Sequence, residues 1–244
     1  MAAGYIRGIQ SQGVYACPKH FAVNSQELRR MAMNAVVDER TLREIYLTGF
    51  EIAVKEGHAK AIMTSYNQVN GTYANENAHL LTDILRDEWG FDGIVITDWG
   101  GSNDHVKGVQ AGSDLEMPNP GLDSARQLIK AVKEGRIKES TIDNSVDRML
   151  EAVFELSQER EKIDDKGFKK HNDLAYRAAA ESAVLLKNSD NILPLKPDTR
   201  VALIGDFAYV PRYQGSGSSV VNATSVEHMN MLINNTTLHV VGCT

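Results

Sequence analysis

The stretch GFDGIVITDWGG, residues 90–101, decides the fold class. Its apolar run, 94–96, is β-branched, follows an Asp-Gly turn signal and stops shortly before a pair of glycines. A run this short with glycines on both sides is typical of a buried strand rather than a helix. Asp98 and Trp99 stand where that strand is expected to end.

Asp98 is the first candidate for chemistry. Burying an unpaired carboxylate costs free energy, so a carboxylate at the end of a core strand is expected to have a purpose. In a chain of alternating strands and helices, the C-terminal ends of the strands open onto the active site. The alternative is that Asp98 caps the next helix. Because Ser102-Asn103-Asp104 is better placed for that, the chemical interpretation is preferred.

The composition is that of an ordinary globular protein and narrows the range of partners. The chain has 244 residues, of which 42% are hydrophobic and 24% charged, and its formal net charge is -6. Its basic residues do not cluster, which argues against nucleic acid, and no apolar run approaches the roughly 20 residues of a membrane helix. The two cysteines, Cys17 and Cys243, imply no disulfide framework. A cytoplasmic location is the simplest expectation.

Hydrophobic periodicity predicts alternating strands and helices in the first two thirds of the chain. The expected strands are residues 15–21, 61–66, 93–98 and 112–117. This alternation favours a parallel sheet with helical crossovers. A capping box, Thr41 and Glu44, is expected to open the helix before the second strand, and Asn70-Gly71 is expected to form a turn.

Polar or aromatic residues stand at or near the ends of all four strands: His20, Tyr66, Asp98 and Glu116. Four such ends out of four favour one pocket at one rim, as in a (β/α) barrel. A closed barrel of this type has eight strands and typically about 250 residues. The sheet is therefore either open or only part of a barrel, and the start of the chain within a helix favours the second alternative.

A charged segment, residues 158–172, predicts a linker between two domains. The predicted organisation is the C-terminal part of a barrel domain over 1–157, a linker with one helix over 158–199, and the start of a second domain over 200–244. The helix of the linker is expected at 174–186. The second domain is expected to begin with the strand VALIG, 201–205.

Lys19 and His20 form a second candidate cluster. An isolated pair of this kind is usually a solvated lysine and a histidine bonded to backbone. At a strand end beside Asp98, however, both side chains can donate hydrogen bonds to hydroxyl groups. Arg30 offers a planar fork of donors for the same task, and Arg29 is nearly as good a candidate on these grounds.

Two aromatic residues and a glycine-rich loop each allow two interpretations. Tyr66 is either a core residue or orients the Asp98 carboxylate, and Trp99 is either packed or a stacking platform for a sugar. The loop 215–219 gives only a weak phosphate-binding signal, because a dinucleotide fingerprint has its glycines directly after the strand. The remaining histidines show no metal-ligand spacing.

Several longer motifs together resemble the β-glucosidases of glycoside hydrolase family 3. They are KHFAVNSQELRR, VDERTLREIYL, IMTSYNQVNG, LLTDILRDEWGFDGIVITDWGG, AGSDLEMP, ESAVLLKN, ILPL and PRYQGSGSS, in the family's order. The resemblance implies that Asp98 is the catalytic nucleophile and that Tyr66 makes a hydrogen bond near it. It assigns the binding of sugar hydroxyl groups to Lys19, His20 and Arg30, and so favours this arginine over its neighbour.

The resemblance also implies a fold. The family fold is a barrel followed by a sandwich domain, so the expected class is α/β: a partial (β/α)8 TIM-type barrel followed by the beginning of an α/β sandwich domain. The family's upstream barrel segment and its acid/base, a glutamate usually beyond the PRYQGSGSS loop, have no counterpart here. The chain is therefore expected to be the central part of a larger enzyme. AVNSQELRR in place of a PGHG-type loop disfavours the N-acetylglucosaminidase branch.

The expected activity is hydrolysis of terminal non-reducing β-D-glucosyl residues through a covalent glycosyl-enzyme on Asp98, with Trp99 among the substrate-binding residues. The expected partner is a small β-glucoside or an oligosaccharide. No cofactor, metal, nucleic acid or membrane is expected, and a homo-oligomer is left open. The alternative is that this chain is catalytically incomplete and acts at most as a sugar-binding or inactive module. A nucleotide-binding protein is a weaker hypothesis, since it depends on the glycine-rich loop alone.

Overall fold

The computed structural model describes residues 1–157, 165–215, 217, 220–234 and 238–243. The chain divides into two compact units, Met1–Lys162 and Ile163–Thr244. Both units mix helices and strands, so the α/β class is confirmed. In the part of the chain that is described, no helix combines the length and the apolar character needed to cross a membrane.

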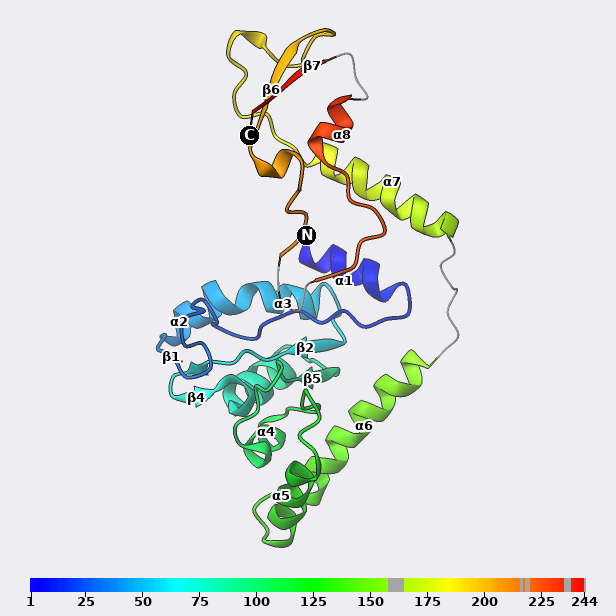
Figure 1. Cartoon of the computed structure of the whole chain (residues 1–244). Helices are drawn as coiled ribbons and strands as arrows, with labels where there is room; N and C mark the ends of the chain where they lie inside the picture. The colour runs from blue at the N-terminus through cyan, green and yellow to red at the C-terminus, as the bar shows by residue number, and fades with distance from the viewer. Residues whose placement is uncertain (158–164, 216, 218–219, 235–237, 244) are drawn as a thin grey trace. The chain divides into compact units, whose positions relative to one another are not determined.

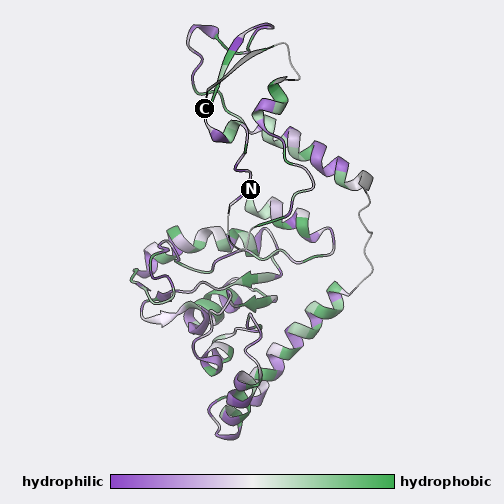
Figure 2. Ribbon diagram, in the orientation of Figure 1, coloured by the Kyte–Doolittle hydropathy of each residue, from purple (hydrophilic) through white to green (hydrophobic). Residues whose placement is uncertain are grey.

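The centre of unit 1 is a short pair of parallel strands, β2 (Ala61–Met63) and β5 (Ile94–Ile96). Figure 1 shows the two strands side by side, and Figure 2 shows that they are among the hydrophobic parts of the unit. One parallel bridge attaches Phe21 next to β2, and another attaches Leu115 to β5. Four segments of the chain therefore run parallel in the order of the sequence, as the alternation predicted.

The two outer segments are less regular than predicted. Phe21 donates a backbone hydrogen bond to Met63, and Met63 donates one to Pro18, but residues 15–20 form no regular strand. Pro18 has no N–H to offer to a ladder, which limits pairing at this position. At 112–117 the pairing is also confined to the bridge at Leu115. The expectation of regular strands was wrong for these two segments.

Helices surround this strand pair. Before β2 the chain forms α1 (Ala2–Gln10), α2 (Glu39–Thr41), η1 (Leu42–Leu47) and α3 (Thr48–Lys55). The η3 helix (His79–Glu88) connects β2 with β5, and after β5 come α4 (His105–Ala111), α5 (Leu122–Lys133) and α6 (Glu139–Leu156). Helices between successive parallel strands are the expected crossover connections.

The main core lies between the strands and η3. The η3 helix buries Leu80, Leu81, Ile84 and Leu85, each at 0% exposure. They pack with Phe21, Ile62 and Val95. Burying a side chain of this size contributes about 1.5–3 kcal/mol, so this interface fixes η3 against one face of the strands.

A second small sheet follows β2. Its order is β1 (Asn34–Ala35), β3 (Gln68–Val69) and β4 (Thr72–Tyr73), with β3 and β4 antiparallel. Asn70 and Gly71 form the predicted turn between β3 and β4, both with positive φ angles, 51° and 89°. The short helix η2 (Ala74–Glu76) leads from this hairpin towards η3.

Local hydrogen bonds decide at which residue two of the helices begin. Asp104 caps α4, as expected, and accepts from the backbone N–H groups of Val106 and Lys107. The capping box predicted from Thr41 is wrong, because the helix begins two residues earlier, at Glu39. Asp38 accepts hydrogen bonds from the N–H and the hydroxyl of Thr41 and is the actual cap.

Unit 2 begins with α7 (Asp165–Glu181), which starts before the predicted residue 174. The VALIG stretch forms the predicted strand, β6 (Arg200–Ile204), and pairs in parallel with β7 (His239–Cys243). The remaining elements are η4 (Ser189–Asn191), η5 (Asp206–Ala208) and α8 (Met229–Asn234). Residues 158–164 of the predicted linker and residues 216, 218 and 219 of the glycine-rich loop lie outside the described residues. The three-part division of the chain stays a prediction.

Candidate active site

Asp98 lies two residues beyond the last residue of β5 and faces His20. Its carboxylate oxygen Oδ2 is 3.1 Å from Nε2 of His20, and its side chain is 16% exposed. The other oxygen, Oδ1, accepts a hydrogen bond of 2.7 Å from the backbone N–H of Trp99. Asp98 does not cap α4, because Asp104 does. The carboxylate therefore lies just beyond the end of β5 and does not serve as a helix cap.

His20 is a neutral neighbour for this carboxylate. Burial lowers the pKa of His20 below 6.5, and the charges of Lys19 and Arg30 lower it further, while Asp98 acts in the opposite direction. A neutral imidazole with its proton on Nε2 donates a hydrogen bond to Asp98. The imidazole therefore orients the carboxylate without forming a full ion pair at neutral pH.

Tyr66 connects the ends of β2 and β5. The residue is 7% exposed, and its hydroxyl donates a hydrogen bond of 2.8 Å to the carbonyl oxygen of Trp99. Burial raises the pKa of Tyr66, and the Asp98 carboxylate raises it further, so the phenol stays protonated. Of the two interpretations of Tyr66, the geometry supports a hydroxyl directed to the neighbourhood of Asp98.

Buried polar residues on either side of Tyr66 fix this part of the site. The Ser65 hydroxyl and the Asn67 side-chain amide both donate to the carbonyl oxygen of Ala22, at 2.8 Å and 3.2 Å. Ala22 follows the His20 segment directly. The residue before Tyr66 and the residue after it therefore join the end of β2 to the segment that carries His20.

Arg30, and not Arg29, reaches the site. The Arg30 guanidinium carbon lies 4.7 Å from the centre of the Tyr66 ring, within the range of a cation–π contact. Its Nη1 is also 2.8 Å from a carboxylate oxygen of Glu27. Arg29 is exposed, whereas Arg30 is partly buried. Of the two arginines, it is therefore Arg30 that lies beside Tyr66, and its role towards a sugar stays a prediction.

Lys19 and Trp99 lie at the margins of this group. Lys19 is exposed, and its charge is felt by His20. The Lys19 side chain also borders an apolar cleft between α1 and α3. Trp99 is 63% exposed, so the alternative that it is packed does not hold in this structure. The roles of both residues towards a substrate stay predictions.

Glu116 does not join the other strand-end residues and belongs to a separate cluster. Its carboxylate is 2.8 Å from Nδ1 of His105 and 3.3 Å from the hydroxyl of Ser124. These side chains and Thr97 line a cleft of about 420 Å³, whereas Asp98 does not. Thr97, directly before Asp98, therefore lines the cleft of Glu116, while the Asp98 carboxylate faces His20. The expectation of one pocket for all four strand ends was wrong for Glu116.

Two residues that contact the site were missed as functional candidates from the sequence, Asn24 and Glu27. The signal was present, because Glu27 and Arg30 are three residues apart in NSQELRR, a spacing that lets side chains meet across a turn. In the described part of the chain, no group of three or more His, Cys, Asp or Glu residues is arranged to hold a metal ion.

Comparisons with known proteins identify relatives of this chain. The family model described as the glycosyl hydrolase family 3 N-terminal domain matches residues 1–152. The thermostable β-glucosidase B of Acetivibrio thermocellus is 48% identical over 93% of this chain, and an exo-α-(1→6)-L-arabinopyranosidase of Bifidobacterium breve is 42% identical over 92% of it. This chain spans about a third of the length of these curated relatives, 30% and 31%.

A solved structure has the same fold. β-Glucosidase 3B from Thermotoga neapolitana, determined in complex with α-D-glucose, superposes with a TM-score of 0.91 at 36% sequence identity. The superposition covers 98% of this chain and 34% of that protein. Both units of the present chain therefore correspond to parts of a longer protein of known structure.

Proposed function

The chain belongs to glycoside hydrolase family 3, and we propose that it carries the nucleophile of a retaining β-glycosidase, Asp98. The observation that carries this proposal is the grouping around Asp98 of His20 at 3.1 Å, with Tyr66 and Arg30 beside it. A carboxylate surrounded by hydrogen-bond donors and a cation is suited to attack a sugar carbon that carries positive charge in the transition state.

The chemistry follows from the two-carboxylate mechanism of retaining glycosidases. Asp98 attacks the anomeric carbon while the bond from that carbon to the leaving oxygen breaks, which gives a covalent glycosyl-enzyme. A carboxylic acid about 5 Å away protonates the leaving oxygen and then takes a proton from the water that releases the sugar. We assign this second group to no residue described here.

Around the reacting carbon, the other side chains bind and orient the sugar. Lys19, His20 and Arg30 are proposed to donate hydrogen bonds to its hydroxyl groups, since ammonium, imidazole and guanidinium groups are all donors. The exposed Trp99 ring is proposed as a stacking surface. Tyr66 is proposed to hold the backbone beside Asp98 through its hydrogen bond to the carbonyl oxygen of Trp99.

The four parallel segments of unit 1 are proposed to be consecutive parts of a (β/α)8 barrel. Their order in space equals their order in the chain, and helices connect them, as barrel geometry requires. Unit 2 is proposed to be the beginning of an α/β sandwich domain, because its parallel strands β6 and β7 are combined with helices. A cytoplasmic location is proposed from the low cysteine content.

The proposed substrate is a terminal β-D-glucosyl residue of a small glucoside or an oligosaccharide. Relatives of similar identity carry different names, a β-glucosidase at 48% and an arabinopyranosidase at 42%. Sugar preference therefore has to be measured with a panel of p-nitrophenyl glycosides. Hydrolysis of the β-D-glucoside at a higher kcat/KM than the other glycosides supports the proposal, and the reverse order refutes it.

The nucleophile is tested in the complete product of this gene. Asp98→Ala is expected to reduce hydrolysis of p-nitrophenyl β-D-glucoside to background, because no glycosyl-enzyme can form. A 2-deoxy-2-fluoro glucoside with a good leaving group is expected to label Asp98 in the wild type, as peptide mass spectrometry would show. Unchanged activity of the Asp98→Ala enzyme, or label on another residue, contradicts the assignment.

A second candidate function concerns the 244-residue chain by itself. Because it spans about a third of its relatives, it is proposed to be catalytically incomplete, with sugar binding as its only activity or with none. Isothermal titration with glucose and an assay of the isolated chain test this candidate. Hydrolysis by the isolated chain at the rate of the complete gene product refutes it.

A further inference from the structure

We infer that Glu27 is a positioning residue that, together with Asn24, holds the Arg30 guanidinium over the Tyr66 ring so that it can bind sugar hydroxyl groups. The inference rests on the proposed function, because it concerns the same site. Glu27 is not expected to touch the substrate. It acts through Arg30, and its removal is expected to have no effect when Arg30 is absent.

Both carboxylate oxygens of Glu27 are engaged. Oε2 is 2.8 Å from Nη1 of Arg30, and Oε1 accepts a hydrogen bond of 3.2 Å from the side-chain amide of Asn24. The backbone N–H of Arg30 also donates to the carbonyl oxygen of Glu27, at 3.2 Å. This turn places the two side chains on the same side, and the bond from Asn24 keeps the carboxylate from rotating away from Arg30.

Arg30 passes this restraint to the ring beside Asp98. Its guanidinium carbon is 4.7 Å from the centre of the Tyr66 ring. The Tyr66 hydroxyl donates to the carbonyl oxygen of Trp99, the residue after Asp98. A chain of direct contacts therefore runs from Asn24 through Glu27, Arg30 and Tyr66 to the backbone next to the nucleophile.

The contact of Arg30 with Glu27, called the clamp below, leaves most of the guanidinium N–H groups free. Arginine has five N–H donors in a fixed planar fork, and the hydrogen bond to Glu27 uses one nitrogen, Nη1. Among the described residues, Glu27 is the only one that accepts a hydrogen bond from the Arg30 side chain. The remaining N–H groups are thus directed at a fixed place and are available to the hydroxyl groups of a sugar.

The size of the effect follows from exposure. The side chains of Arg30 and Glu27 are 40% and 71% exposed, and ion pairs of this kind are weak. Glu27→Gln is therefore expected to raise KM for p-nitrophenyl β-D-glucoside about two- to fivefold, with a smaller change in kcat. Glu27→Asp, which keeps the charge on a shorter side chain, is expected to lie between this variant and the wild type.

The decisive experiment is a double-mutant cycle in the complete gene product with Glu27→Gln, Arg30→Ala and both together. If Glu27 acts through Arg30, the double variant has the same KM and kcat as Arg30→Ala alone. Equal effects of Glu27→Gln with and without Arg30 overturn the inference, and so does an unchanged KM of Glu27→Gln in the presence of Arg30. Glu44→Gln, which breaks an exposed pair with Arg40, is the matched control and is expected to leave KM unchanged.

A structural readout separates this inference from the proposed function. Crystal structures of the wild type and of Glu27→Gln are expected to differ in the position of the Arg30 guanidinium over Tyr66, whether or not the protein is active. A guanidinium that keeps its position in the variant overturns the clamp. If the wild type is inactive but Arg30 is displaced in the variant, the proposed glycosidase function is refuted while the role of Glu27 in positioning Arg30 is supported.

Discussion

His20 illustrates how a single residue responds to its surroundings. Burial lowers its pKa below 6.5, while the Asp98 carboxylate 3.1 Å away raises it. Asp98→Asn removes the opposing charge and is therefore expected to lower the pKa of His20 further. An NMR titration of the imidazole signals measures this pKa in both proteins. His79 is the internal control, because its pKa is raised above 6.5 by other carboxylates and is expected to remain unchanged.

The same shift fixes the sign of one contribution to stability. Since the pKa of His20 is lower in the folded state, the unfolded chain binds more protons just below pH 6.5, and stability rises with pH there. The contribution of neutral His20 is complete above pH 6.5 and is lost as the pH falls through the folded-state value. A titration midpoint of His20 at or above 6.5 contradicts this expectation.

The sequence predicted which residues lie together at the site, but it did not distinguish their individual roles. Asp98, His20, Tyr66 and Arg30 were predicted and do come together. Spacing could not choose between Arg30 and its neighbour, because the choice depends on which side chain a turn directs towards Tyr66. The surroundings of Glu116 could not be predicted from its position at a strand end. Its partner, His105, lies on α4, and the pattern of strands does not show where that helix packs.

At the scale of elements, a buried charged cluster connects β5, η3 and α6. The Asp114 side chain is fully buried and accepts hydrogen bonds from Arg86, Arg148, Ser145 and the backbone N–H of Val95. Each of these four donors belongs to one of those three elements. One carboxylate therefore joins a strand to two helices that are distant in sequence.

Asp114→Ala is expected to destabilise the protein by about 3–5 kcal/mol, because it leaves the partly buried Arg86 and Arg148 guanidinium groups without the buried carboxylate that pairs with both. Urea denaturation of the wild type and the variant measures the change in the free energy of unfolding. Asp123→Asn is the control, since Asp123 pairs with Arg126 at the surface, and it is expected to cost less than about 1 kcal/mol. A loss below about 1 kcal/mol for Asp114→Ala contradicts the role of the cluster.

Elements were predictable where apolar periodicity was strong. The apolar run of β5 has a pattern that burial alone decides, and the strand Ile94–Ile96 formed within the predicted range 93–98. The start of the α2 helix was missed because Asp38 competes with Thr41 for the cap, and local hydrogen bonds decide between them. Residues 15–21 were predicted as a strand, but strand formation depends on pairing along the whole segment, and Pro18 interrupts it.

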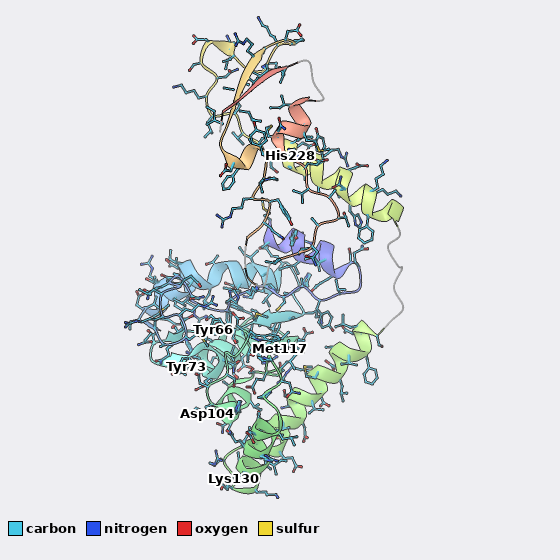
Figure 3. The ribbon with its side chains drawn as sticks, in the orientation of Figure 1. Tyr66, Tyr73, Asp104, Met117, Lys130 and His228 are labelled. Carbon is cyan, nitrogen blue, oxygen red and sulfur yellow. The ribbon has the colours of Figure 1, made fainter. Side chains whose placement is uncertain are left out.

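At the scale of the whole molecule, α6 presents an apolar face that no described residue covers fully. Val146, Leu150, Val153 and Phe154 are between 46% and 69% exposed, and Figure 3 shows side chains of α6 projecting away from the helix. The last three follow Val146 by four, seven and eight residues, which places all of them along one side of a helix. Exposed apolar faces of this kind promote association.

The isolated 244-residue chain is therefore expected to self-associate at micromolar concentration, which sedimentation velocity measures. Leu150→Lys combined with Phe154→Lys is expected to reduce the association, because it places two charges on this face. The paired control is Glu151→Lys with Glu155→Gln, which changes charge on the same helix without removing apolar surface. A monomeric wild-type chain, or equal association in both variants, contradicts the expectation.

The position of the site along the sequence has a consequence for biosynthesis. The side chains of His20, Tyr66 and Arg30 that lie beside Asp98 all come from the first 66 residues, and unit 2 begins only at Ile163. At roughly 5–20 residues per second, translation needs several seconds to add that unit. A nascent chain on the ribosome thus already contains His20, Arg30 and Tyr66 beside Asp98, and these contacts do not have to wait for unit 2 to be translated.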